Sequence, residues 1–197
     1  MRNAVITMYD KCANGQNADR AFDLMPVKDV ISWTTIITAL SRAGNVKKAR
    51  EYFNEMPERN VITWNSMLAT YIQNGFWEDG LKLYVQMCRL GSKPDHITFL
   101  TSVTACACLA LMKLGEQIIS TAEKCGSASR NSLVNSIVTL YSRCGRIGDA
   151  QKVFDSIVTK NTISWNAMMS GYAQSGYGRK VIEFLNRCYN WDINQTT

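Results

Sequence analysis

The sequence predicts an all-α protein in which helix-turn-helix repeat units stack into a solenoid. The first observation is a tryptophan that recurs with similar neighbours at Trp33, Trp64 and Trp165. The first two are 31 residues apart, and the 101 residues from Trp64 to Trp165 equal two intervals of 35 and one of 31. Self-similarity at such a period is the sequence signature of a repeat array.

A second landmark keeps the same spacing. Small or apolar residues follow one another at intervals of 31, 31, 35, 35 and 31, namely Ala18, Ala49, Gly80, Gly115, Ala150 and Val181. Chance does not readily explain two landmarks that recur at the same intervals. Small side chains at a fixed place in each unit let helices approach closely, so we expect these positions inside the stack.

Each unit contains two apolar stripes separated by a turn. In the second unit, Trp33, Ile36, Ile37 and Leu40 fall at i, i+3, i+4 and i+7, which is one face of a helix. Gly44 is expected to end that helix, and Pro57 to end the one that follows it. A single helical pair cannot bury both stripes, so neighbouring pairs must stack.

These landmarks divide the chain into six units without a linker. Their bounds are 1–29, 30–60, 61–95, 96–130, 131–161 and 162–197. The first lacks its opening residues, the fourth is divergent because Phe99 replaces the tryptophan, and the last decays after Cys188. We expect a segment of a longer array, or a short product whose ends pair or fray.

The composition excludes several classes of protein. The chain has 197 residues, 46% of them hydrophobic, which is not the composition of a disordered chain. Its net charge of +6 and pI near 9.0 favour a polyanionic partner. The longest apolar run, Val103 to Met112, is too short to cross a bilayer, so no membrane association is expected. No signal peptide is visible at the N-terminus.

No motif for catalysis, a metal or a cofactor is visible. The seven cysteines include no CxxC pair, and His96 is the single histidine. A zinc deaminase would need His and Cys ligands with a glutamate acid/base, and that set is missing from the sequence. We therefore expect neither an enzyme nor a bound cofactor.

The residues that follow the tryptophan suggest a binding function. This place holds Asn3, Thr34, Asn65, Leu100, Asn135 and Asn166, and the last residue of each complete unit is Asp29, Asn60, Asp95, Arg130 or Asn161. We expect the first set to face outward and to meet the second set at each junction. An amide offers a donor and an acceptor, as reading a base edge requires. The alternative is that these residues cap helices, which explains the second set well.

Several segments resemble the pentatricopeptide repeat family, in particular its plant PLS subclass of mixed short and long units. The most specific are Ser164–Gln174, Tyr141–Gly145 and Lys93–Asp95, and the resemblance covers essentially the whole chain. It implies a right-handed superhelix of about six units that binds single-stranded RNA, one base per unit. The C-terminal E/DYW deaminase domain found in part of the subclass has no counterpart in the sequence.

The resemblance also implies the bases that are read. The pairs are Asn3/Asp29 and Asn65/Asp95 for uracil, Thr34/Asn60 for adenine, and Asn135/Asn161 for cytosine and more weakly uracil. Leu100 with Arg130 matches no pair of the family, so the fourth unit is expected to be silent. Asn166 favours a pyrimidine. With the N-terminal unit at the 5′ end, the implied core is 5′-UAUNCY-3′.

Two further sets are implied to contact RNA. Ile31, Ile62, Ile97 and Ile163 would sandwich the bases, and Lys11, Arg42 and Arg143 would approach phosphates. Ser132 departs from the first pattern. The implied role is that of a specificity factor for RNA editing or processing in a mitochondrion or chloroplast, with a deaminase or editing-complex protein acting in trans. The alternatives are a tetratricopeptide-like scaffold that binds peptides, or a truncated product without function.

Overall fold

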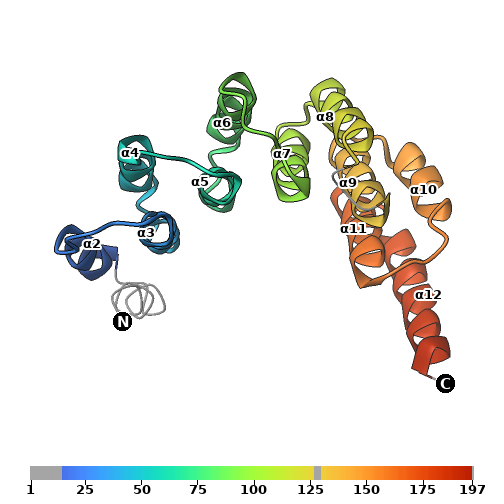
Figure 1. The fold of residues 1–197 in the computed structure, drawn as a ribbon. Helices are drawn as coiled ribbons and strands as arrows, with labels where there is room; N and C mark the ends of the chain where they lie inside the picture. Colours follow the sequence, from blue (N-terminus) through green and yellow to red (C-terminus); the bar gives the residue numbers. More distant parts are fainter. Residues whose placement is uncertain (1–14, 127–129, 197) are drawn as a thin grey trace. The chain divides into compact units, whose positions relative to one another are not determined.

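The computed structural model describes residues 15–126 and 130–196, and all regular secondary structure in these residues is α-helical (Figure 1). The helices are α2 (Gly15–Asp23), α3 (Val30–Arg42), α4 (Val46–Glu55), α5 (Val61–Gln73), α6 (Trp77–Arg89), α7 (His96–Cys108), α8 (Met112–Lys124), α9 (Arg130–Arg143), α10 (Ile147–Asp155), α11 (Thr162–Gln174) and α12 (Gly178–Thr196). The odd-numbered helices are the first helices of the repeat units, and the even-numbered ones are the second helices. This confirms the predicted succession of helical pairs.

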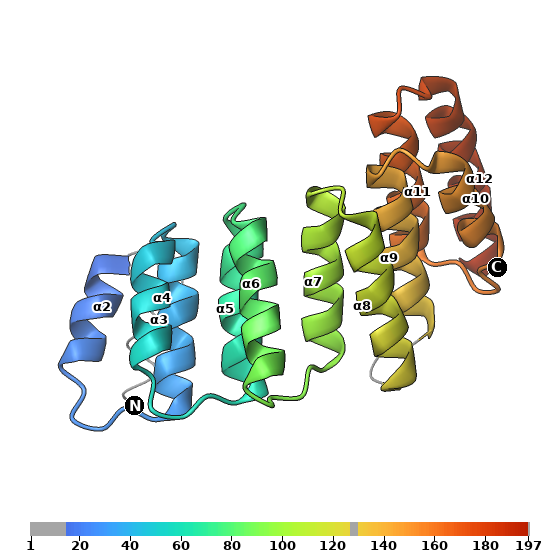
Figure 2. The same ribbon diagram turned by 90° about the horizontal axis from the view of Figure 1, so that it is seen from above.

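The chain divides into two compact parts, residues 1–102 and 103–197. In the N-terminal part, α3 packs against α2, α4 and α5, and α5 packs against α4 and α6. Figure 2 shows these helices side by side, and Figure 1 shows α4 and α6 on one side of α3 and α5. In the C-terminal part, α9 packs against α8, α10 and α11, and α11 packs against α10 and α12. Each part is thus two layers of helices, with the first helices forming one layer.

The turns between paired helices share one backbone feature. Gly44, Gly75, Gly145 and Gly176 have φ values of +73°, +80°, +77° and +79°, a conformation that glycine adopts without steric cost. The predicted helix stop at Gly44 is therefore confirmed. In the divergent fourth unit, Ala110 takes the same place with φ +54°. A methyl group there carries the steric penalty that glycine avoids.

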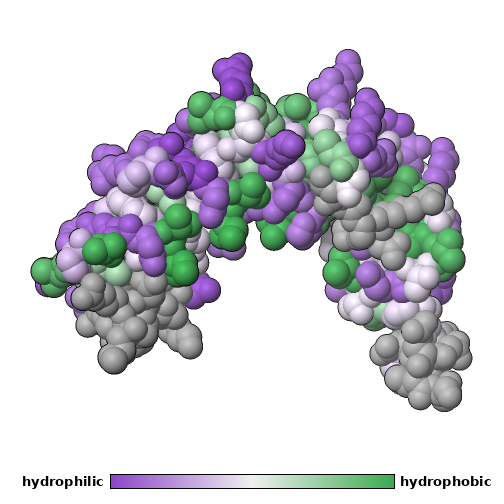
Figure 3. Space-filling model, viewed as in Figure 1, coloured by the Kyte–Doolittle hydropathy of each residue, from purple (hydrophilic) through white to green (hydrophobic). Residues whose placement is uncertain are grey.

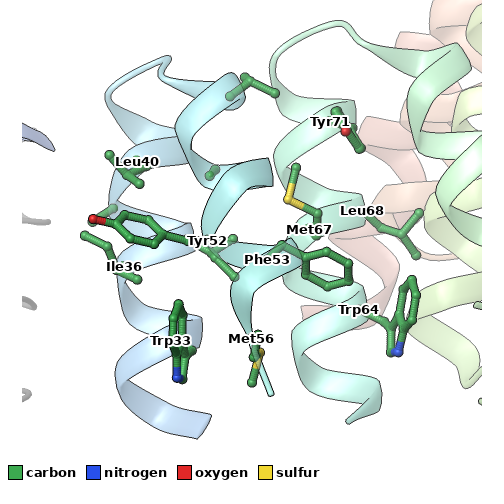
Figure 4. Packing of buried hydrophobic residues seen from close by; sticks show 14 of the residues in the cluster. Trp33, Ile36, Leu40, Tyr52, Phe53, Met56, Trp64, Met67, Leu68 and Tyr71 are labelled. Atoms are coloured by element: carbon green, nitrogen blue, oxygen red, sulfur yellow. The ribbon is translucent and has the colours of Figure 1, made fainter. Parts of the chain in front are cut away.

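The recurring tryptophan lies at the junction with the preceding unit. Its ring meets the edge of an aromatic ring on the preceding second helix, and the centroid distances for Phe22–Trp33, Phe53–Trp64 and Phe154–Trp165 are 4.8, 4.9 and 5.0 Å. Figure 4 shows Phe53 and Trp64 close together in this core. All three tryptophans are buried. The edge-to-face arrangement adds to the stabilisation from buried apolar area.

The small residues lie inside the stack, as predicted. Ala18, Ala49 and Ala150 have no exposed surface. At Gly115, a Cβ atom would lie 2.5 Å from a Cδ atom of Leu140, so an alanine there would require the Leu140 side chain to shift. None of the helices described in the structure is long and apolar enough to cross a membrane.

Replacement of Ala49 by leucine is expected to destabilise the second unit by roughly 1–3 kcal/mol, because the added atoms have no space between α3 and α4. Since each unit contacts only its neighbours, hydrogen exchange should accelerate first in α3 to α5. Lys47→Leu adds a leucine at an exposed place on the same helix and should leave exchange unchanged. Uniform acceleration along the whole chain would contradict the repeat architecture.

Candidate nucleic-acid interface

An isoleucine is exposed at the second place of four first helices. Ile31, Ile62, Ile97 and Ile163 have exposed fractions of 63%, 64%, 46% and 64%. In Figure 3, apolar patches interrupt the hydrophilic surface of the N-terminal part. All four side chains are therefore exposed to solvent at the same place in their units.

Asn65, the residue after Trp64, takes part in a hydrogen-bond network with the start of the next first helix. Its Nδ2 donates to Asp95 Oδ1 over 2.9 Å, and the Thr98 hydroxyl donates to Asn65 Oδ1 over 2.7 Å. The Thr98 backbone N–H also donates to Asp95 Oδ1 over 2.9 Å, which caps α7. Two residues that sequence analysis paired at a junction are thus in direct contact.

The network favours the ionised form of Asp95. Partial burial opposes ionisation of this carboxyl, but the hydrogen bonds from the Thr98 backbone, Asn65 and the Thr98 hydroxyl outweigh it, with a smaller contribution from His96. The pKa of Asp95 consequently lies below its ordinary value. At neutral pH the pair is an amide beside a carboxylate.

Two other junctions that the structure describes differ from this one. Thr34 donates its hydroxyl to Val30 O of its own helix over 2.7 Å, while the Asn60 side chain accepts the Thr63 N–H over 3.0 Å. At the next described junction, Asn161 accepts the Ser164 N–H over 2.9 Å. The carboxamide oxygen of Asn135 is buried there, and no hydrogen-bond partner for it is found among the described residues.

The residue after Trp165 lies beside a cavity. Asn166 lines a hollow of about 340 Å³ together with Arg143, Ile163 and Gln174. One residue from each implied set, base-reading, base-sandwiching and phosphate-contacting, is therefore found in one cavity between α9 and α11. Ser142 lines it as well, and the buried hydroxyl of Ser142 has no partner within the described chain.

One expectation was wrong and one was confirmed. The residue after the tryptophan was expected to face outward, but Asn65 and Asn135 are each only 8% exposed. The reason is that the next first helix packs over this place, as α11 packs on α9. Asn166 is exposed as expected. The capping interpretation of the terminal residues is confirmed, because Asp29, Asn60 and Asn161 are side-chain N-caps of α3, α5 and α11.

The candidate phosphate contacts are exposed where the structure describes them. Arg42 and Arg143 are in the last turns of α3 and α9, and Arg143 Nη1 lies 3.4 Å from Cys108 Sγ. Asn3 and Lys11 are outside the described residues, and so are the side chains of Arg130 and Ser132. In the described part of the chain, no three His, Cys, Asp or Glu side chains gather where they could hold a metal ion.

Sequence analysis did not single out Thr98. The sequence contains a local signal for one of its contacts. Thr98 comes three residues after Asp95, which is the spacing at which a side chain contacts an N-cap residue. That spacing identifies the capping contact. It does not reveal the bond to Asn65, which is 33 residues earlier in the chain.

Stacked helical pairs that recur along the chain define a helical-repeat protein. A family model described as "PPR repeat" matches residues 31–61, 132–162 and 163–189, and one described as "PPR repeat family" matches residues 59–108. These matches cover more than half of the sequence. The chain therefore belongs to the pentatricopeptide repeat family.

Similar proteins come from plants. A putative pentatricopeptide repeat-containing protein of Arabidopsis thaliana is 40% identical over 193 residues, which are 98% of this chain and 24% of that protein. Another Arabidopsis protein of this kind, described as mitochondrial, is 35% identical over 89% of this chain and 23% of its own length. The chain thus spans about a quarter of the length of these relatives.

Solved structures share the fold. The pentatricopeptide repeat protein PPR10 from maize matches with a TM-score of 0.73 and 21% identity over 97% of this chain and 29% of its own. PPR10 in complex with an 18-nt psaJ RNA element gives a TM-score of 0.61 and 16% identity, with 94% of this chain and 34% of PPR10 covered. Nuclear proteinaceous RNase P 2 of Arabidopsis thaliana gives 0.66 and 12% identity, with 87% and 41% covered.

Asp95→Asn is expected to lower the stability of the protein at neutral pH. Because the pKa of Asp95 is lower when folded, its charge stabilises the fold above the ordinary carboxyl pKa, and this contribution is lost as the pH falls through the folded pKa. The stability gap between wild type and variant, measured by urea unfolding, should therefore shrink below about pH 5. Asp79→Asn, which alters only an exposed ion pair with Lys82, is the control. A pH-independent gap for Asp95→Asn would contradict the network.

Proposed function

We propose that this chain binds single-stranded RNA in a sequence-specific manner, with one base at each unit junction. The observation that carries the proposal is the pairing of Asn65 with Asp95 beside the exposed Ile62 and Ile97. An apolar side chain can lie against the face of a base, while an amide and a carboxylate can meet its edge. The RNA-bound structures of PPR10, a protein of the same fold, support this class of ligand.

The preferred core that we propose is 5′-UAUNCY-3′. Asn65 with Asp95 would read the third base as uracil, and Thr34 with Asn60 the second as adenine. The two asparagines Asn135 and Asn161 would accept cytosine at the fifth place. Each pair combines a residue on one first helix with the N-cap of the next, so each base would bridge two units.

The cellular role that we propose is that of a specificity factor for RNA editing or processing in a plant organelle. Its support is the alternation of 31- and 35-residue intervals, which resembles the PLS subclass, and the mitochondrial description of one relative. As the resemblance implies, we propose that chemistry on the RNA is supplied by an editing-complex protein acting in trans. A deaminase acting in trans fits this role.

The affinity for RNA should fall with salt. With Lys11, Arg42 and Arg143 each neutralising one phosphate, the slope of log affinity against log salt should be about −2, since single strands give roughly −0.7 per contact. Arg143→Gln should make the slope shallower by about 0.7. Fluorescence anisotropy at several salt concentrations measures both values. A wild-type slope near zero would reject the phosphate assignments.

Asn60→Asp is expected to change the preferred second base from adenine to guanine, because a threonine–aspartate pair in this family resembles a guanine reader. The fold should be retained, since an aspartate can accept the Thr63 N–H that Asn60 now accepts over 3.0 Å. Titration of wild type and variant against UAU- and UGU-containing RNAs at fixed salt measures the preference.

The matched control is Asn54→Asp, which makes the same chemical change at an exposed place on α4 away from the junction. It should keep the wild-type preference for adenine and so separate a local effect at the junction from the general effect of added negative charge. If Asn60→Asp also keeps that preference, or if wild type does not distinguish the two RNAs, base reading by these pairs is refuted. A peptide-binding scaffold would then be the better account.

A further inference from the structure

A hydroxyl group at the third place of the following helix bonds both members of the reading pair Asn65/Asp95. We infer that Thr98 is a positioning residue that fixes the orientation of the Asn65 amide and thereby sets the preference of the third unit for uracil over cytosine. This inference rests on the proposed function, because it assumes that Asn65 and Asp95 meet a base.

The orientation of the Asn65 amide follows from the chemistry of its two neighbours. A carboxylate only accepts hydrogen bonds, so the group 2.9 Å from Asp95 Oδ1 must be the Nδ2 donor. The carboxamide oxygen then faces the Thr98 hydroxyl, 2.7 Å away, which shares its single proton between this oxygen and Asp95 Oδ1, 2.9 Å away. Thr98 has no exposed surface, so water does not compete for this bond. Rotation of the amide by 180° would place an oxygen against the carboxylate and a donor against the hydroxyl.

The fixed orientation has a consequence for the base. One Nδ2 proton is donated to Asp95, and the second Nδ2 proton is left to donate to a base. The hydrogen bonds of the network all use Oδ1 of Asp95, so Oδ2 is the acceptor that the carboxylate contributes. With the Nδ2 donor at O4 of uracil and Oδ2 at its N3–H, both groups are paired. Cytosine in the same position would place its N4 amino group against the donor and its unprotonated N3 against the acceptor, which costs free energy.

The junction between the fifth and sixth units shows what happens without this bond. Ser164 occupies the place of Thr98, but its hydroxyl donates to Asn161 O over 2.7 Å. The amide oxygen of Asn135 has no partner among the described residues. Because no hydroxyl among the described residues donates to that oxygen, the orientation of the Asn135 amide is not fixed in the way that the Asn65 amide is. This unit should therefore distinguish uracil from cytosine less than the third unit does.

The third place of α5 makes a different contact. The Thr63 hydroxyl donates to the Asn60 backbone carbonyl over 2.9 Å. This contact stays within the cap of α5. Thr63 is fully buried as well, so a change at Thr63 reproduces the loss of a buried hydroxyl without touching the Asn65 pair.

The test compares Thr98→Val with Thr63→Val and Thr98→Ser. Valine keeps the shape of threonine and removes the hydroxyl, so Thr98→Val should reduce the preference for uracil over cytosine at the third base by about 3- to 10-fold. Thr63→Val should leave that preference unchanged, and Thr98→Ser should retain most of it. Anisotropy titrations with RNAs that differ only at the third base provide the readout.

A second readout does not use RNA. In Thr98→Val the NMR signals of the Asn65 side-chain amide should shift, and the pKa of Asp95 should rise because a donor near its carboxylate is lost. Thr63→Val should change neither. If these signals stay where they are in Thr98→Val, the proposed positioning role is refuted.

The two proposals fail in different ways. If wild type binds RNA without distinguishing the third base, the proposed function is refuted and the role of Thr98 with it. If wild type prefers uracil and Thr98→Val keeps the full preference, only the role of Thr98 is refuted. Loss of the preference in both valine variants would mean that any buried hydroxyl matters, and this also overturns the specific role of Thr98.

Discussion

The edge-on contact between each recurring tryptophan and an aromatic ring of the preceding unit is the interaction on which the rest of the structure depends. Neither helix of a pair buries its apolar face alone, and this contact joins successive pairs at Phe22–Trp33, Phe53–Trp64 and Phe154–Trp165. Because the ring is anchored at the junction, the next residue in the chain is held there too. The place of Asn65 is thus a direct consequence of the burial of Trp64.

The same packing buries polar groups at the junctions. A buried polar group without a hydrogen bond costs about 1–3 kcal/mol. Asn65 avoids this cost through Asp95 and Thr98, whereas the indole nitrogens of Trp64 and Trp165 are buried without partners among the described residues. The large apolar surface of an indole offsets that cost at the tryptophans. A small amide has no comparable surface, so its hydrogen bonds decide how it is oriented.

The N-cap residues have two roles, helix capping and the proposed contact with a base. Asp29, Asn60 and Asn161 start their helices by accepting a backbone N–H, and the same side chains are proposed to meet a base. Only short side chains with an acceptor oxygen serve as good N-caps. The set of residues available for reading a base at this place is therefore limited by helix stability. A change between asparagine and aspartate keeps the N-cap, so it can alter the base preference without loss of helix stability.

The sequence by itself determined the repeat period, the helical pairs, the turn at Gly44 and the capping role of Asn60. All of these depend on residues close together in the chain or on spacing that repeats. Only the tertiary structure decided that Asn65 and Asn135 are buried and that Thr98 donates to Asn65 across 33 positions. Helical periodicity shows which residues share a face, but it does not show which neighbouring helix covers that face. The partner of a buried amide is set by the distance between helices, and that distance follows from packing.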